Sequence, residues 1–329
     1  MRRWVRRLGL LLGLGATTAF VLYTVGVLRT QDLSAYVSVS AVTGIGIAAI
    51  GYSLIVPMSA LAWRRLLADF GVAKTWSELS VIMGVTQLAK YIPGNVGQHV
   101  GRAAMSIGRG IPMRPYSISV VSEAILAVIA ATVVGIAGCG LSGMSSDVLR
   151  HHGAIVVPAI IILACISALV VILARHTLLR LLHGDTRRHH RNGERISLPR
   201  GGVLVFALGI YILNYLVFGA GITAMVMLLL PNQQIQWPLL TGSFALAWVV
   251  GFFAPGAPAG FGVREGIMLG LLQFTYTRPD ALLIIIALRL ATTIGDILCF
   301  LAGSLALLVL RERTHANAGG YPTGKDDET

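Results

Sequence analysis

The stretch Lys90-Tyr91-Ile92-Pro93-Gly94-Asn95-Val96-Gly97-Gln98 interrupts an apolar region, and a second Pro-Gly pair, Pro255-Gly256, interrupts another. In both places an arginine follows eight residues after the glycine, Arg102 in the first copy and Arg264 in the second. Proline and glycine break helices, and an arginine at bilayer depth is costly. Because both features occur twice, we predict two broken membrane helices built around an anionic ligand.

Composition places the chain among membrane proteins. Hydrophobic residues make up 55% of it and charged residues 12%, and the mean hydropathy is +0.77. These values are typical of a chain that crosses a bilayer several times. Cys139, Cys165 and Cys299 stand alone in apolar runs, which indicates neither a disulfide framework nor a metal site. We expect no cofactor and no metal.

Apolar windows of spanning length predict six full transmembrane helices. The first, Leu8 to Leu28, follows an arginine-rich terminus and is expected to be retained, because it lacks a convincing small-residue cleavage site. The others cover residues 41–63, 117–139, 153–174, 203–230 and 281–310. Between them, segments 79–109 and 238–276 are each divided by a Pro-Gly pair into halves at or below the roughly 17 residues that a span requires. We interpret each as a re-entrant hairpin.

The distribution of positive charge favours this topology. With the amino terminus inside, the predicted cytoplasmic segments carry 19 of the 26 lysines and arginines, in line with the positive-inside rule. A single crossing by either interrupted segment would exchange the sides of all later loops and weaken this bias. We therefore expect both termini in the cytoplasm, a location in the cell membrane, and hairpins that enter from opposite sides as an inverted repeat.

The predicted fold class is an all-α integral membrane protein with about six transmembrane helices and two oppositely oriented re-entrant helical hairpins. One membrane domain is expected over residues 1–312, followed by a disordered cytoplasmic tail over 313–329. The cytoplasmic loop 175–202 contains Arg187-Arg188-His189-His190-Arg191. A topology signal lying against anionic headgroups explains this run, so we expect no nucleic-acid partner.

The broken helices indicate how an anion would be held. A break frees backbone N–H groups at the start of the second half-helix, and their partial positive charge favours an anion. Lys90 precedes the first break, while Arg102 and Arg264 lie two turns into the second half-helices. A phosphate near the turns would therefore meet amides and cations together. His99 is a candidate proton carrier or a hydrogen-bonded packing residue.

Internal pairing is a second interpretation of these cations. Glu123, Glu265 and Asp296 can neutralise three of the four intramembrane cations. Arg289 and Asp296 are seven residues apart, which places them two turns apart on one helix face, toward one cavity. Asn95 can cap a half-helix, and Gln87 and Asn214 can bridge helices. The candidate substrate-binding residues are Lys90, Pro93, Gly94, Asn95, Gln98, Arg102, Pro255, Gly256, Arg264, Glu265, Arg289 and Asp296.

The residues around both breaks resemble a known family. Lys90 to Gln98 with Gly101-Arg102 closely resembles the signature of the lysylphosphatidylglycerol synthase transmembrane, or flippase-like, family, and Ala254 to Gly266 resembles its second motif. Ala287-Leu288-Arg289-Leu290 and Asp296 also fit. The resemblance implies an integral membrane protein of bacteria or archaea that translocates lipid.

Two features depart from the family pattern. The chain ends nineteen residues after the last predicted span, without an aminoacyl-transferase domain, so we expect a stand-alone form that does not synthesise lysyl-lipid. Ala257-Pro258-Ala259 stands where relatives tend to have a plainer Gly-rich turn, which leaves the shape of the second turn open.

Three functions fit the sequence. The first is a flippase that moves an anionic phospholipid or a polyprenyl-phosphate-linked headgroup by alternating access, with membrane lipids, and enzymes of lipid or glycan synthesis, as partners. The second is an ion-coupled carrier of a small organic anion, which would use the same half-helix physics. A lipid-modifying enzyme or a scaffold is the third; no nucleophile-and-base set or metal-ligand spacing supports an enzyme. The lipid, direction, energy coupling and oligomeric state stay open.

Overall fold

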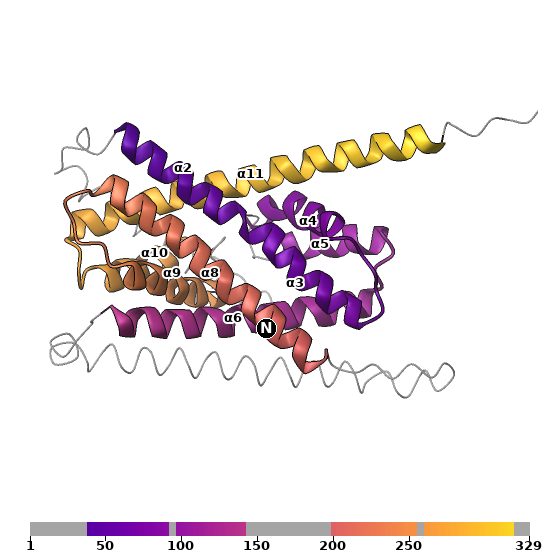
Figure 1. The fold of residues 1–329 in the computed structure, drawn as a ribbon, viewed down its shortest axis with the longest axis horizontal. Helices are drawn as coiled ribbons and strands as arrows, with labels where there is room; N and C mark the ends of the chain where they lie inside the picture. The colour runs from indigo at the N-terminus through magenta and orange to yellow at the C-terminus, as the bar shows by residue number, and fades with distance from the viewer. Residues whose placement is uncertain (1–37, 92–96, 143–198, 255–259, 319–329) are drawn as a thin grey trace, which may run out of the picture.

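The computed structural model describes residues 38–91, 97–142, 199–254 and 260–318, and within these ranges the regular secondary structure is helical (Figure 1). Four apolar stretches are long enough to cross a membrane: Val39–Asp69, Met113–Leu141, Gly201–Leu229 and Arg278–Val309. They coincide with four of the six predicted spans, as helices of sufficient length and apolar character. The predicted spans at 8–28 and 153–174, and all but the last residues of the loop 175–202, lie outside the described residues.

The first described span consists of two helices in line, α2 (Val39–Ser53) and α3 (Ile55–Asp69). Pro57 explains the interruption, because a proline has no N–H to donate to the carbonyl four residues earlier, which is that of Ser53. Cys299 of a neighbouring helix lies against this carbonyl instead, its Sγ donating to Ser53 O at 3.4 Å. A neighbouring helix thus satisfies the backbone group that the proline frees, as membrane helices require.

Three further long helices complete the described bundle: α6 (Met113–Leu141), α8 (Gly201–Leu229) and α11 (Arg278–Ala318). The last continues past residue 312 into the predicted tail, and residues 319–329 lie outside the described residues. Small residues allow close packing where lipid offers no hydrophobic driving force. A Cβ on Gly84 would come within 2.8 Å of the Cys299 carbonyl oxygen, so only glycine permits this approach to α11.

The two interrupted segments form short helices on either side of their Pro-Gly pairs. The first contains α4 (Trp76–Val85), the 3₁₀ helix η2 (Gln87–Tyr91) and α5 (Gly97–Gly108); the second contains α9 (Trp237–Phe253) and α10 (Val263–Leu272). In Figure 1, α4 and α5 lie at one end of the long helices, and α9 and α10 lie at the other. Both turns lie outside the described residues, and with them the predicted site residues Pro93, Gly94, Asn95, Pro255 and Gly256.

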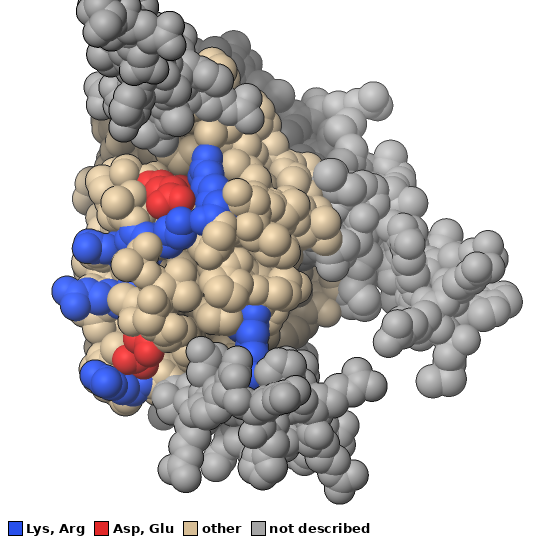
Figure 2. Space-filling model, turned by 90° about the vertical axis from the view of Figure 1, so that its right-hand side faces the viewer, with Lys and Arg blue, Asp and Glu red and all other residues tan. Residues whose placement is uncertain are grey.

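Basic side chains gather at the end of the bundle that carries α4 and α5. Figure 2 faces this end and shows separate lysine and arginine side chains with two acidic groups between them. Lys74 contacts Glu78 at 3.2 Å and Arg200 contacts Asp69 at 3.5 Å. The basic residues in the helix ends and loops here are Arg64, Arg65, Lys74, Arg109, Arg114 and Arg200. Segments predicted to share one side of the membrane therefore share one end of the fold.

Candidate functional site

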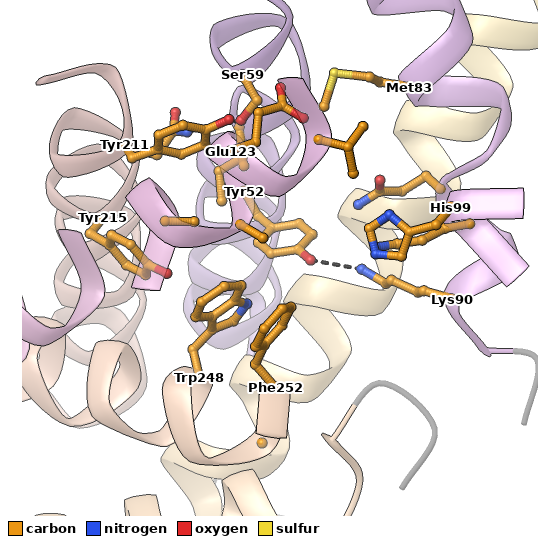
Figure 3. A pocket seen from close by; sticks show the side chains of 18 of the residues that line it. Tyr52, Ser59, Met83, Lys90, His99, Glu123, Tyr211, Tyr215, Trp248 and Phe252 are labelled. Atoms are coloured by element: carbon orange, nitrogen blue, oxygen red, sulfur yellow. Dashed lines mark hydrogen bonds between the residues drawn. The ribbon is translucent and has the colours of Figure 1, made fainter. Parts of the chain in front are cut away.

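A cavity of about 260 Å³ lies between the two interrupted segments and the long helices (Figure 3). The first interrupted segment contributes Lys90, Gln98 and Arg102 to its lining, and the second contributes Arg264. The structure therefore brings the arginines of the two Pro-Gly motifs, which are far apart in sequence, to one cavity. His99 lines it as well.

Asp296 of α11 holds the segment just before the first break. Its carboxylate is fully buried and accepts hydrogen bonds from Lys90 Nζ at 2.6 Å and Gln87 Nε2 at 3.0 Å on Oδ1, and from the Tyr91 hydroxyl at 2.6 Å on Oδ2. Lys90 also donates to the Tyr52 hydroxyl at 2.9 Å (Figure 3). These bonds fix the position of Lys90 at the cavity and tie η2 to α11.

Arg102 is buried between a carboxylate and an aromatic ring. Its Nη2 lies 2.8 Å from Glu123 Oε2, and its guanidinium lies 3.6 Å from the centroid of the Trp63 ring. Stacking on a ring and pairing with a carboxylate are the two interactions that best compensate a buried guanidinium. The pairing interpretation of this arginine is therefore confirmed, and Arg102 still lines the cavity.

A similar arrangement joins α10 to α11. Arg289 Nη1 lies 3.4 Å from Glu265 Oε1, and its guanidinium lies 3.8 Å from the centroid of Phe261. The other carboxylate oxygen of Glu265 accepts the Gly262 N–H at 2.6 Å and caps α10. In each half of the chain, an arginine–glutamate pair with an aromatic ring on the arginine thus links the short helix after the break to the next long helix. The short helix carries the arginine in the first half and the glutamate in the second.

Arg289 and Asp296 do not face one cavity, which corrects the sequence prediction. Arg289 and Glu265 line a second, smaller cavity of about 30 Å³ together with Arg264, whereas Asp296 contacts Lys90 beside the main one. Seven residues of helix separate the two side chains by about 10 Å along the axis. Asp296 therefore pairs with Lys90 of the first interrupted segment, and Arg289 pairs with Glu265 of the second.

The side chain of Arg264 occupies a slot made by two glycines. A Cβ on Gly251 of α9 would overlap Arg264 Cγ, and one on Gly260 would lie 2.6 Å from Arg264 Cδ. Gly260 also has a φ of +72°, which favours glycine. The guanidinium lies 5.5 Å from the centroid of Phe244. Both glycines therefore set the direction in which Arg264 leaves α10 toward the cavity.

The charged residues around the two cavities carry one net positive charge. Within the described helices, three carboxylates face four cations at this depth. The carboxylates are Glu123, Glu265 and Asp296, and the cations are Lys90, Arg102, Arg264 and Arg289. An anion that enters the main cavity would balance this charge.

Aromatic residues form a wall of the cavity that sequence reasoning missed. Trp248 and Phe252 of α9 stack with ring centroids 5.2 Å apart, and Tyr215 of α8 meets Trp248 edge-on at 6.0 Å (Figure 3). Each lies in a strongly apolar helix, so composition does not distinguish these three residues from neighbours that face lipid. The four-residue spacing of Trp248 and Phe252, which places both on one helix face, is the signal that the sequence offered.

Comparison with known proteins connects this arrangement to a family. The family model for the lysylphosphatidylglycerol synthase TM region matches residues 8–303, most of the chain. Comparison with curated proteins finds none that is similar. The matched range contains both interrupted segments and every charged residue of the two cavities, and it indicates a lipid-related function in the membrane.

Proposed function

The chain belongs to the lysylphosphatidylglycerol synthase TM family, and from this premise we propose that it moves an anionic lipid headgroup between the two leaflets. The substrate is an anionic phospholipid or a polyprenyl-phosphate-linked lipid. One observation carries the proposal: the two copies of the Pro-Gly motif contribute Lys90, Arg102 and Arg264 to a single cavity. A site shared by two interrupted segments is typical of transporters that expose it alternately to either side.

The chemistry of the cavity suits a phosphate. Lys90 provides a compact charge beside Asp296, while Arg102 and Arg264 provide planar groups that can bind two oxygens at once. Arg102 and Lys90 keep their carboxylate partners at 2.8 and 2.6 Å. Because each of these cations also interacts with a protein carboxylate, its attraction for a bound phosphate is weakened. A weaker attraction favours a site that can release its substrate.

A lipid suits the apolar side of the cavity better than a small soluble anion does. Its walls include Trp248, Phe252 and Phe244, which offer an anion no cation and, apart from the Trp248 indole N–H, no hydrogen-bond donor. Such a wall accommodates the glycerol backbone and the first carbons of acyl or prenyl chains. The long helices around it expose many apolar side chains, as expected where tails remain in the bilayer.

The placement of the short helices supports alternating access. The pairs α4/α5 and α9/α10 lie at opposite ends of the long helices (Figure 1). We propose that they are re-entrant hairpins that enter from opposite sides of the cell membrane, with both termini and the basic end in the cytoplasm. Movement of one pair relative to the other would open the cavity to one side at a time.

Leaflet exchange in proteoliposomes tests the proposal. The purified protein is reconstituted with fluorescent phosphatidylglycerol, phosphatidylcholine or a polyprenyl phosphate, and a membrane-impermeant reductant reports the fraction of label in the outer leaflet. We expect accelerated exchange of an anionic class only. Equal exchange of all classes would indicate a non-specific leak, and exchange of none, from protein shown to be folded, would contradict the proposal. Uptake of soluble organic anions by the same vesicles tests the carrier alternative.

Replacing Gly251 with alanine is expected to reduce exchange by about tenfold or more, because the added methyl group displaces Arg264 from its slot. Gly270→Ala is the matched control: this glycine lies on α10 and a Cβ there would meet nothing within 4 Å. Initial exchange rates and the yield of monodisperse protein are measured for both. Normal exchange by Gly251→Ala would show that the orientation of Arg264 is unimportant.

A further inference from the structure

One side of the main cavity contains buried hydrogen-bond acceptors without partners. Glu123 Oε1 and Asn214 Oδ1 accept no hydrogen bond of standard geometry from the described residues, although the Tyr211 hydroxyl interacts with the Glu123 carboxylate. The two residues are only 6% and 4% exposed, and both line the cavity. Buried polar atoms in folded proteins are almost always hydrogen-bonded. The Asn214 oxygen therefore calls for a donor that enters the cavity, and the Glu123 carboxylate can accept a further donor beside Tyr211.

The surroundings of these oxygens differ from those of Lys90. The Asn214 amide nitrogen already donates to Ser59 Oγ at 3.0 Å, and the other carboxylate oxygen of Glu123 is paired with Arg102. Figure 3 shows Ser59, Glu123 and Tyr211 grouped on one side of the cavity, with Lys90 and His99 on another. The cavity thus has one region suited to an anion and one suited to hydrogen-bond donors.

We propose that Glu123 and Asn214 form a subsite that accepts hydrogen bonds from hydroxyl groups of the headgroup. This inference rests on the proposed function: a headgroup whose phosphate contacts Lys90 and Arg264 has its remaining atoms in the same cavity. Hydroxyl groups suit the subsite better than an ammonium group, because Arg102 already neutralises Glu123 and would repel a second cation. The substrate class is therefore a phosphate ester of a polyol, either glycerol or a sugar.

A pair of lipids with equal charge tests the subsite. Phosphatidylglycerol and phosphatidylethanol are both singly negative phosphodiesters, but only the first has free hydroxyl groups. We expect wild-type protein to exchange phosphatidylglycerol about tenfold faster or more, since a site built to hydrogen-bond a hydroxyl discriminates against the analogue that lacks it. In Asn214→Leu this ratio should fall severalfold. Thr223→Val, a polar-to-apolar change on the same helix whose hydroxyl bonds only to Gly219 O, should keep the wild-type ratio.

The outcomes separate the subsite from the transport function. Equal exchange of the two lipids by wild-type protein would overturn the subsite and leave the flippase proposal standing. Phosphatidylethanolamine exchanged as fast as phosphatidylglycerol would overturn both the preference for hydroxyl groups and the restriction to anionic headgroups. If no lipid is exchanged, the flippase proposal fails, and short-chain forms of the same two phosphatidyl lipids are compared by the Tm shift of the solubilised protein. A larger shift with the glycerol form supports the subsite, and equal shifts overturn it. Glycerol 3-phosphate is tested in the same Tm assay. A shift with this soluble compound would indicate that the ligand is a soluble phosphate ester and not a lipid.

Discussion

Replacing Asp296 with asparagine is expected to destabilise the protein by about 3–5 kcal/mol, the usual effect of leaving a buried charge without its partner. The asparagine keeps the size of the side chain and part of its hydrogen bonding to Gln87 and Tyr91, but it removes the charge that Lys90 contacts at 2.6 Å. Unfolding in mixed micelles of increasing dodecyl sulfate content measures the loss. It should be the largest stability effect among single substitutions of the polar residues here.

The double variant Asp296→Asn, Lys90→Met separates the loss of an ion pair from the loss of packing. Removing both charges of a buried pair is often close to neutral, whereas removing one is not. We therefore expect the double variant to recover most of the stability while losing lipid exchange, because Lys90 lines the cavity. A double variant as unstable as Asp296→Asn would show that the hydrogen bonds to Asp296, and not its charge, hold η2 against α11.

Replacing Arg264 with glutamine is expected to reduce lipid exchange by about 10- to 150-fold, the loss that corresponds to one charge-assisted hydrogen bond of about 1.5–3 kcal/mol. The fold should be retained, because the side chain is only partly buried. Exchange rates are measured at several lipid densities, so that weaker binding is distinguished from slower movement.

Two further variants make the Arg264 result interpretable. Arg278→Gln is the same chemical change at an exposed position at the start of α11, and it should leave exchange at the wild-type rate. Arg102→Gln should also lose exchange, but it leaves Glu123 buried without its cation, so its folded yield should fall. Wild-type exchange by Arg264→Gln would remove the second motif from the site and contradict a site shared by both interrupted segments.

The local features of the sequence were sufficient to predict the described long helices and the position of the two Pro-Gly breaks. Runs of apolar residues predict the spans because the thickness of the bilayer sets their length, and α6 and α8 begin and end within a few residues of the predicted limits. The break within 41–63 was missed, since a single proline is tolerated in membrane helices when a neighbour satisfies the freed carbonyl. Here the neighbour is Cys299, which is distant in sequence.

The sequence by itself determined that the chain is a helical membrane protein with two interrupted segments, and that its intramembrane charges comprise four cations and three carboxylates. Those properties follow from composition, helix breaking and the cost of charge in lipid, which are all local. Only the tertiary structure decided which cation pairs with which carboxylate, so that Arg289 contacts Glu265 whereas Asp296 contacts Lys90. It also decided that Trp248, Glu123 and Asn214 line one cavity. Such contacts depend on how helices pack, and close packing is set by glycines and side-chain shapes that lie far apart in the chain.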